Sequence, residues 1–424
     1  MNDTIFAVSS GAPPSAIAIL RISGSGADMA AAALTTMTLP EPRYAALRTL
    51  RAGDADLDTA LVIRFPAPNS ATGEDVVEFH LHGGRATIAA VTRALAQIPG
   101  LRPAEPGEFT RRAFEHGRMD LTEAEGLADL LRAETEHQRR SALASSSGGL
   151  SRIVEALRKE VLTASARIEA AIDFADEDDV LPWPERKSAL LGLSQRVELL
   201  LSKPPAERLR DGIRIAIAGP PNVGKSTLLN VLVARDAAIV SPIAGTTRDV
   251  VEVPVMIDGL PLIFIDTAGL RNNSDDEIEA IGIKRAEALV ESCDLLLWLG
   301  NGADTPKRSN VLSVRTKADL LDAPDDPRLS VSGLTGEGMP ALVRAIGDAA
   351  KSLLPASDSI AFNARQRACL TELVVEIASA ADTDDLLLSA EHLRVARGAL
   401  NRVTGRAGVE DMLDALFGSF CIGK

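Results

Sequence analysis

The first 84 residues alternate short apolar runs with two segments of helical periodicity. The runs TIFAVSS, AIAILRISG, ALVIRFPAP and DVVEFHLHGG are typical of β-strands, whereas ADMAAAAL and RATIAAVTRALAQI are typical of helices. This pattern predicts a small α+β domain at the start of the chain.

A second pattern begins after Pro106, because no proline occurs between Pro106 and Pro182. Apolar residues then recur at spacings of three and four, as expected for one face of a long amphipathic helix; they are Ile153, Leu157, Val161, Ala164, Ile168 and Ile172. We therefore expect this region to be helical.

From Gly212 the pattern changes to strands and helices in α/β alternation. It opens with the buried-strand run IRIAIAG and closes near Leu354, after the helical segment MPALVRAIGDAAKSLL. Helical periodicity returns after Pro355: one expected face holds Leu370, Val374 and Ile377, and another holds Leu386, Leu393, Ala396, Leu400 and Val403. Because this last segment is too short for a core of its own, we expect it to pack on the earlier helices, with the α/β domain inserted between the two halves.

Composition narrows the class of protein. A chain of 424 residues with 46% apolar content can form two to four domains. The net charge of -14 argues against nonspecific coating of nucleic acid, although it leaves room for a local basic patch. No apolar run is long enough to span a membrane, the N-terminus lacks a secretion signal, and only three cysteines are present. We expect a cytoplasmic protein without disulfides.

The segment GPPNVGKS, from Gly219 to Ser226, fits the phosphate-loop pattern G-x4-G-K-[ST] between a strand and a helix. In such loops backbone N–H groups wrap the phosphates, and the following helix adds positive potential at its N-terminus. Lys225 would neutralise the β and γ oxygens, and the Ser226 hydroxyl would bind Mg²⁺.

Three further motifs follow in the order expected of a GTPase. GTTRD (245–249) offers Thr247 as a second Mg²⁺ ligand, and DTAG (266–269) places a carboxylate near the metal. TKAD (316–319) puts Asp319 where it can accept two hydrogen bonds from guanine, which adenine cannot offer. SGL (332–334) would close over the base. The motifs together predict GTP binding, with an ATPase or a decayed structural fold as the alternative.

Two positions concern hydrolysis. Where Ras-type proteins carry a water-orienting glutamine after the DTAG glycine, this chain has Leu270, so another group must orient the water. Asn222 is similar to the asparagine of potassium-activated GTPases, where it helps to hold a monovalent cation beside the phosphates. The alternative is a loop asparagine that only stabilises the turn.

Beyond these motifs, segments along nearly the whole chain resemble the tRNA uridine-5-carboxymethylaminomethyl modification GTPases, the MnmE or TrmE family. They are ILRISG, TGEDVVEF, HGG, PGEFTRRAF, EAAIDF, DTAGLR, IEAIGI and the terminal FCIGK. The tetrapeptide from Cys421 to Lys424 is the most distinctive of them.

The resemblance implies three parts: an α+β N-terminal domain that binds tetrahydrofolate and dimerises, a discontinuous all-α helical domain, and an inserted α/β Ras-like P-loop G domain. The corresponding boundaries are 1–118 for the first, 119–210 and 355–424 for the two helical halves, and 211–354 for the G domain. Potassium would let two G domains meet and hydrolyse GTP. As a homodimer, the chain would form a heterotetramer or larger complex with the flavin-dependent MnmG (GidA) protein. That complex would modify C5 of U34 in certain tRNAs with a 5-formyl- or 5,10-methylene-tetrahydrofolate one-carbon unit.

The resemblance also assigns roles to particular residues. The K⁺ ligands would be Asn222, Ser241, Ile243 and Thr246, the middle two through backbone carbonyls. Glu279 would orient the attacking water; without the resemblance it would be interpreted as a solvated helix carboxylate. Folate contacts would be Arg21, Glu78, Arg118 and Lys424, since cations suit the glutamate tail and Glu78 can accept from pterin N–H groups. Cys421 has either a part in the tRNA chemistry or an incidental place in the tail.

The full set of expected site residues follows from the motifs and the resemblance together. The catalytic residues would be Lys225, Glu279 and Cys421. The guanine nucleotide (GTP or GDP), with Mg²⁺ and K⁺, would be contacted by Asn222, Val223, Gly224, Lys225, Ser226, Thr227, Ser241, Ile243, Ala244, Gly245, Thr246, Thr247, Asp266, Thr267, Ala268, Gly269, Thr316, Lys317, Asp319, Ser332, Gly333 and Leu334.

Three features depart from the family pattern. SSGAPPSA replaces the usual N-terminal loop, so one basic contact to folate or to the second subunit is in doubt. Thr316 stands for the usual asparagine, and its hydroxyl can still tether the phosphate loop. The segment from Gly300 to Asn310 is barely long enough for a crossover helix, which we expect to be shortened or lost.

Other signals carry less weight. His80 and His82 share a strand face, and we expect them to pack rather than bind metal. Arginines 394, 397, 402 and 406 would either touch tRNA phosphates or form a solvated face. Two rival functions stay open: an RNA-binding GTPase switch in ribosome assembly, and a nucleotide-binding scaffold with a vestigial folate site.

Overall fold

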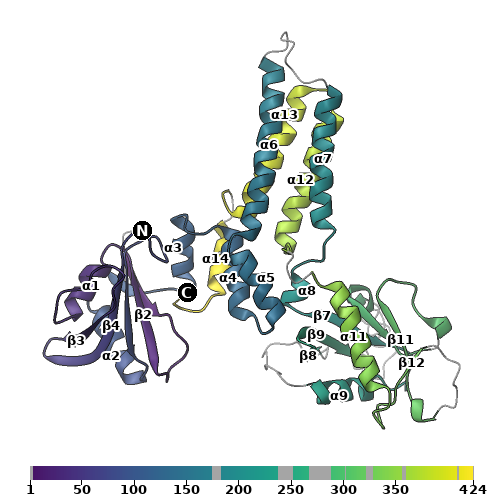
Figure 1. The fold of residues 1–424 in the computed structure, drawn as a ribbon, viewed down its shortest axis with the longest axis horizontal. Coiled ribbons are helices and arrows are strands. Elements are labelled where there is room, and N and C mark those ends of the chain that lie inside the picture. The colour runs from purple at the N-terminus through teal and green to yellow at the C-terminus, as the bar shows by residue number, and fades with distance from the viewer. Residues whose placement is uncertain are drawn as a thin grey trace, which may run out of the picture. The chain divides into compact units, whose positions relative to one another are not determined.

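A computed structural model describes residues 3–173, 183–236, 252–266, 288–300, 302–320, 328–355, 360–407 and 410–423. It separates into two compact units. The first comprises residues 1–128, 145–158 and 398–424, and the second comprises residues 129–144 and 159–397. Segments far apart in the sequence thus build each unit, as expected for a chain with an inserted domain (Figure 1).

The first unit contains a six-stranded sheet in the order β3-β4-β5-β2-β1-β6. Its neighbours are antiparallel except for β1 and β6, which run parallel. The strands are β1 (Thr4–Val8), β2 (Ile17–Ser23), β3 (Ala46–Ala52), β4 (Ala55–Phe65), β5 (Val76–His82) and β6 (Leu101–Pro103). The four predicted strand runs correspond to β1, β2, β4 and β5, whereas β3 and β6 were not predicted.

Helices α1 (Ala27–Leu34) and α2 (Arg85–Ala96) pack on one face of this sheet (Figure 1). The core between them contains Leu20, Ile22 and Phe79, which are almost completely buried. Because successive strand residues point to opposite faces, Arg21, Glu78 and His80 lie on the other face. Two of the four expected folate contacts, Arg21 and Glu78, therefore share this second face.

The first unit also contains α3 (Glu108–Glu115), the first part of α4 (Leu121–Arg132) and α14 (Glu410–Gly418). Their apolar residues form one cluster, in which Leu121 meets Phe417 and Phe420. The end of the chain is thereby packed onto helices that directly follow the N-terminal sheet.

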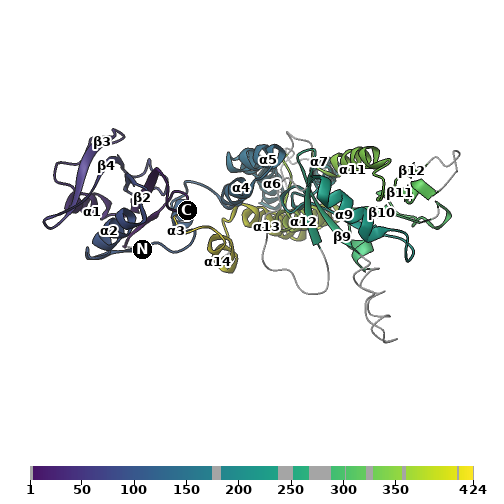
Figure 2. The same ribbon diagram turned by 90° about the horizontal axis from the view of Figure 1, so that it is seen from below.

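In the second unit, long helices lie side by side (Figures 1 and 2). They are α6 (Gly149–Asp173), α7 (Trp183–Leu201), α12 (Ala364–Asp382) and α13 (Leu386–Thr404). The shorter α5 (Glu136–Ser146) also lies mainly in this unit, and α5, α6 and α13 continue into the first unit. Val161, Ile168, Leu370 and Ile377 are buried as expected. The expected stripes were wrong at Ile153, Ala164, Ile172, Val374 and Leu386, which are only partly buried. At Val374, the neighbouring Leu373 points into the core instead.

The second sheet has the order β12-β11-β10-β7-β9-β8 and is parallel except for β8, which runs antiparallel to β9. Its strands are β7 (Ile213–Ala218), β8 (Glu252–Ile257), β9 (Leu260–Asp266), β10 (Leu295–Trp298), β11 (Val311–Arg315) and β12 (Leu329–Ser330). Helices α9 (Lys225–Asp236) and α11 (Met339–Leu353) pack with it in one core. This is the doubly wound α/β architecture expected of a G domain.

Between β10 and β11 the described residues form only a short 3-10 turn, η2 (Gly302–Asp304). The prediction that the crossover helix is shortened or lost is therefore confirmed for residues 302–310. Arg308 from this connection donates to the carbonyl oxygens of Val290 and, at 2.7 Å, Cys293. Its guanidinium thus satisfies backbone acceptors at the end of the preceding helical turn.

The short helix α8 (Glu207–Arg210) leads into the G domain. Arg208 donates to Asp294 at 2.6 Å and to the Leu353 carbonyl at 3.3 Å, and the latter lies at the end of α11. On the helical side, Glu207 accepts the backbone N–H of Ala364 at 2.6 Å. One short helix therefore joins the entry and exit of the inserted domain to its helical host.

Candidate functional site

The phosphate loop runs from the end of β7 into α9, whose first residue is Lys225. Lys225 is only 8% exposed, and its ammonium group donates to the carbonyls of Gly219 at 3.0 Å and Pro220 at 2.8 Å. Asn222 has a positive φ of 60° at the exposed tip of the loop. The Lys225 ammonium group thus lies at the centre of the loop, and bound phosphates would compete with the two loop carbonyls for it.

The TKAD loop is fastened directly to the phosphate loop. The Thr316 hydroxyl donates to the Val223 carbonyl at 2.6 Å, which confirms the predicted tether. Lys317 takes a positive φ of 59°, and Asp319 follows in the 3-10 helix η3 (Ala318–Leu320). The Ala318 N–H bonds to the Val331 carbonyl at 3.1 Å, so the loops after β11 and β12 are joined as well.

The SGL loop follows β12 and is ordered by a buried serine. Ser332 is completely buried, and its hydroxyl accepts the N–H groups of Leu334 at 3.2 Å and Thr335 at 3.1 Å. A Cβ atom built on Gly333 would lie 3.1 Å from the Thr227 methyl group, so this loop adjoins the start of α9. The loops after β7, β11 and β12 therefore meet at one edge of the sheet, where α/β proteins bind ligands.

Several expected site residues lie outside the described part of the chain: Ser241, Ile243, Ala244, Gly245, Thr246, Thr247, Thr267, Ala268, Gly269, Glu279 and Lys424. Asp266 is described only as the last residue of β9. The structure consequently places one expected Mg²⁺ ligand, Ser226, and one expected K⁺ ligand, Asn222. The remaining metal and switch assignments stay predictions.

In the first unit, two of the expected folate residues form an ion pair across adjacent strands. Arg21 on β2 donates to Glu78 on β5 at 2.9 Å, with side chains 22% and 14% exposed. The Arg21 guanidinium also lies 5.6 Å from the centre of the Phe109 ring, within the range of a cation–π contact. Arg118 is exposed beside Gly73, and no hydrogen bond or ion pair joins it to Arg21 or Glu78 within the described residues.

The end of the chain docks on the same sheet. Ile422 forms an antiparallel bridge with Pro106, and Cys421 beside it is exposed. Gly423 has a φ of 97°, and a Cβ atom there would lie 2.0 Å from the Val8 carbonyl oxygen, which excludes any larger residue. Val8 follows the residue that pairs with Arg21 across the β1–β2 ladder. The tail therefore reaches the strand next to the Arg21–Glu78 pair.

The sequence missed the contacts that hold α3 in place. Arg112, only 2% exposed, donates to Asp3, Glu74 and Glu108 at 3.0 Å each. Burial favours a higher pKa for Glu108, but hydrogen bonds from Arg102, the Glu105 N–H and Arg112 outweigh it and lower the pKa. The spacing of Glu108 and Arg112 by four residues was the available signal. This network fixes the helix that carries Phe109.

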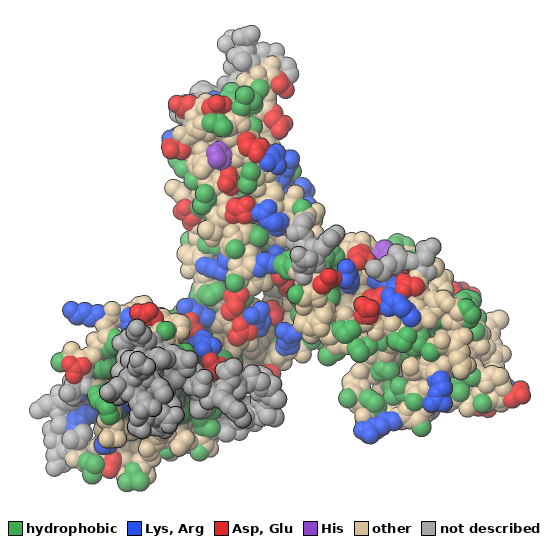
Figure 3. Space-filling model, turned by 180° about the vertical axis from the view of Figure 1, so that it is seen from behind, with side chains coloured by type: hydrophobic (Ala, Val, Ile, Leu, Met, Phe, Trp, Pro, Cys, Tyr) green, Lys and Arg blue, Asp and Glu red, His purple; other side chains and the backbone are tan. Residues whose placement is uncertain are grey.

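The remaining candidate histidines and arginines whose contacts are described pair with carboxylates. His82 contacts Asp58 at 2.7 Å, and His80 lies 3.5 Å from Glu78. Of the surface arginines, Arg394 pairs with Glu391 at 2.6 Å and Arg406 with Glu155 at 3.1 Å. On the visible face of the helical bundle, cations and carboxylates are interspersed (Figure 3). Both interpretations of this face stay open.

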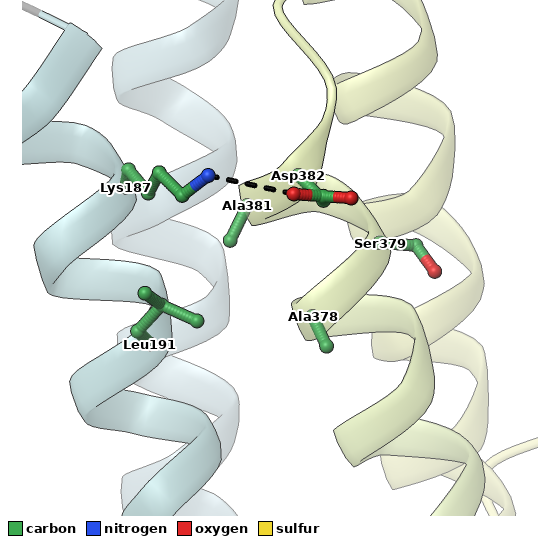
Figure 4. Close-up of a pocket in the computed structure, with 6 residues that line it drawn as sticks. All are labelled: Lys187, Leu191, Ala378, Ser379, Ala381 and Asp382. Carbon is green, nitrogen blue, oxygen red and sulfur yellow. Dashed lines mark hydrogen bonds and ion pairs between the residues drawn. The ribbon is translucent and has the colours of Figure 1, made fainter.

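A shallow pocket of about 360 Å³ lies between α7 and α12 (Figure 4). Lys187 and Asp382 cross its mouth at 3.4 Å, and their side chains are 40% and 88% exposed. Leu191, Ala378, Ser379 and Ala381 complete the lining. None of the expected site residues lines it, so we assign it no ligand.

The joined phosphate, TKAD and SGL loops define a P-loop GTPase. Residues 121–421 match the family model of the MnmE helical domain, and residues 4–118 match that of the GTP-binding protein TrmE N-terminus. The chain belongs to the MnmE family of tRNA modification GTPases.

Relatives match along nearly their entire length. The tRNA modification GTPase MnmE of Erythrobacter litoralis is 55% identical over 100% of both chains. That of Rhizorhabdus wittichii is 51% identical over 100% of this chain and 97% of its own. The solved G domain of the FeoB iron transporter of T. maritima is 24% identical to this chain. The match covers 32% of this chain and 98% of that G domain, with a TM-score of 0.23. Within the described residues, no helix is long and apolar enough to cross a membrane.

Proposed function

We propose that this GTPase modifies C5 of the wobble uridine U34 in certain tRNAs. It acts with the flavin-dependent MnmG protein and takes a one-carbon unit from 5-formyl- or 5,10-methylene-tetrahydrofolate. Support comes from the relatives, whose names describe tRNA modification GTPases and which match this chain from end to end. GTP hydrolysis in the inserted domain would drive the cycle, and the N-terminal sheet and the docked tail would hold the reacting groups.

The N-terminal sheet supports the folate part of the proposal. Arg21 offers a cation to the glutamate tail of a folate, and Glu78 offers an acceptor to pterin N–H groups. Phe109 adds an aromatic surface against Arg21. Cys421 belongs to the tail segment 421–423 that docks at β1, Lys424 would follow it, and Arg118 would have to turn toward the ion pair to contribute.

The same sheet face supports a homodimer. The register places Ile17 opposite His82 and Leu61 opposite both His80 and Leu47, so these apolar residues share the face of Glu78. Ile17, Leu47 and Leu61 are 59%, 61% and 41% exposed. Clustered exposed apolar side chains are typical of a protein interface. A second copy of the chain would cover them and enclose the folate between the subunits.

The G domain supports the proposed metals through the residues that are described. The exposed hydroxyl of Ser226 and the exposed tip residue Asn222 are oxygen donors, which Mg²⁺ and K⁺ prefer. Ser226 and Thr247 would hold Mg²⁺, and Asn222, Ser241, Ile243 and Thr246 would hold K⁺. Bound there, the cations would neutralise phosphate charge, while Glu279 would orient the attacking water. GTP turnover should then be far faster in KCl than in NaCl; equal rates would exclude the K⁺ site.

We also propose the boundaries 1–118, 119–210, 211–354 and 355–424 for the N-terminal domain, the first helical half, the G domain and the second helical half. α8 precedes Asp211 directly, and α11 ends at Leu353. The proposed G-domain limits thus fall at the short joint described above.

The observation that carries the proposal is the docking of residues 421–423 at β1, the strand next to the Arg21–Glu78 pair, in a chain that also contains a complete phosphate loop. The test is nucleoside mass spectrometry of tRNA from cells with and without the gene. The C5-modified wobble uridine should disappear in the deletion strain and return with the wild-type chain. It should not return with the Lys225→Ala variant. Unchanged modification in the deletion strain would reject the proposal.

The second candidate function is a GTPase switch in ribosome assembly. It would need GTP and RNA but neither the tail nor a folate. Ribosome profiles of the same deletion strain separate the two: a defect in subunits with normal wobble modification would favour the switch. A scaffold without turnover is excluded if purified protein hydrolyses GTP.

A further inference from the structure

The hydroxyl proton of Thr316 is already used in a hydrogen bond within the nucleotide site. A threonine hydroxyl has a single proton to donate. In this structure Thr316 Oγ1 donates it to the Val223 carbonyl at 2.6 Å, a short distance for an O–H···O bond. Breaking this bond would release the phosphate loop from the TKAD loop, so the side chain of residue 316 has no donor left for a ligand.

Guanine presents two kinds of edge to a protein. Its six-membered ring offers N–H donors at N1 and N2 and an acceptor at O6, while N7 of the five-membered ring is an acceptor only. Asp319, in the loop that Thr316 starts, can satisfy the N–H donors. Recognition of N7 would require a side-chain or backbone donor near residue 316.

The SGL loop supplies a donor for O6. Its Leu334 and Thr335 N–H groups are already bonded to the Ser332 hydroxyl at 3.2 and 3.1 Å. The N–H of Gly333, between them, has no hydrogen-bond partner within the described residues. Gly333 also adjoins Thr227 at the start of α9, so its N–H lies at the edge where the nucleotide site forms.

We propose that Thr316 determines how this G domain recognises its base. Its hydroxyl ties the phosphate loop and therefore offers purine N7 no side-chain donor, so guanine is selected through its six-membered ring. An asparagine at this position would differ, because its amide has a carbonyl and two N–H donors and can serve both the loop and N7. The inference rests on the guanine nucleotide site described above.

The test compares GDP with 7-deaza-GDP, in which a C–H group replaces N7, on the full-length wild-type chain by calorimetry. We expect the two dissociation constants to agree within threefold. A larger loss of affinity for 7-deaza-GDP would overturn the inference. If the chain binds neither nucleotide, the nucleotide site itself fails, which separates that outcome from a failure of the inference.

Two variants sharpen the result. Thr316→Asn should bind GDP at least threefold more tightly than 7-deaza-GDP, because N7 gains a donor. Thr316→Ala should weaken both nucleotides by the same factor, because only the tether is lost; a loss for GDP alone would show that the hydroxyl contacts N7. Thr305→Ala is the matched control: its hydroxyl bonds to Ser313 at 3.4 Å, and both affinities should be unchanged.

Discussion

The two six-stranded sheets of this chain carry their candidate sites in different places. In the G domain, parallel strands bring the phosphate, TKAD and SGL loops to one edge, and the site is built from loops after the strands. In the N-terminal unit, antiparallel strands place Arg21 and Glu78 in the middle of β2 and β5, and the candidate site is a sheet face.

This difference decides how each site is held together. The G-domain loops are joined by bonds to backbone atoms, such as Thr316 to the Val223 carbonyl and Leu334 N–H to Ser332. The N-terminal face depends instead on side-chain charges, above all Arg112 and its three carboxylates. The loss of one charged side chain should therefore affect only the nearby loops in the G domain, whereas in the N-terminal unit it should destabilise the whole sheet.

The largest expected effect is on the stability of the N-terminal unit. Arg112→Met removes the buried cation that Asp3, Glu74 and Glu108 share, which should cost about 3–5 kcal/mol. Glu74 keeps only the Ser23 hydroxyl and Glu108 only Arg102 as side-chain donors. Hydrogen exchange of full-length protein should speed up across β1–β5 and stay unchanged across β7–β11. Arg111→Met, in the same helix, removes exposed pairs with Glu115 and Asp414 and should cost less than about 1 kcal/mol. Equal effects of the two variants would contradict the comparison.

A second effect is confined to the nucleotide site. Lys225→Ala removes the charged donor at the centre of the phosphate loop, so GDP affinity should fall by about 100-fold. Hydrogen exchange of β1–β5 should not change. Lys351→Ala, which removes an exposed pair with Asp258 at 3.8 Å, should leave GDP affinity intact. Normal nucleotide affinity in Lys225→Ala would remove this residue from the site.

A smaller loss is expected for folate at the sheet face. Arg21→Met removes one charge-assisted contact, so calorimetry should show about a 10- to 50-fold weaker affinity for 5-formyltetrahydrofolate, with GDP affinity unchanged. Arg51→Met alters an exposed pair with Asp56 in the same sheet and serves as the control. Folate binding that is indifferent to Arg21 would move the site elsewhere.

The smallest expected effect concerns pH. The pKa of Glu108 is lowered from 4.5, and that of Asp3 from 3.8, because bonds from Arg102 and other donors outweigh the effect of burial. A lowered pKa stabilises the fold above the unfolded-state value and loses that contribution as pH falls through the folded-state value. Protection factors across β1–β5, which compare the measured exchange rate with the intrinsic rate at each pH, should therefore fall below pH 4.5. Unchanged protection factors down to pH 3 or so would contradict this account.

The sequence predicted the elements and the G-domain site because both are encoded locally. The phosphate loop lies within eight consecutive residues, from Gly219 to Ser226, and the missing crossover helix follows from the length of residues 300–310. Contacts between residues far apart in the sequence could not be predicted from local patterns. Phe109 against Arg21, Arg112 with Asp3, and the exposed position of Arg118 depend on how α3 packs on the sheet. The prediction failed at Val374 because an apolar stripe shifted by one residue around the helix fits the same sequence pattern.

The short helix α8 has a consequence for engineering. Arg208 reaches both Asp294 and the last turn of α11, so the chain leaves the nucleotide-binding module close to where it entered. The Ala206 N–H also bonds to the Phe362 carbonyl at 3.1 Å on the host side. A few glycine and serine residues between Ala206 and Phe362 would span this gap, giving a bundle without the module, and the module could be produced as an independent polypeptide.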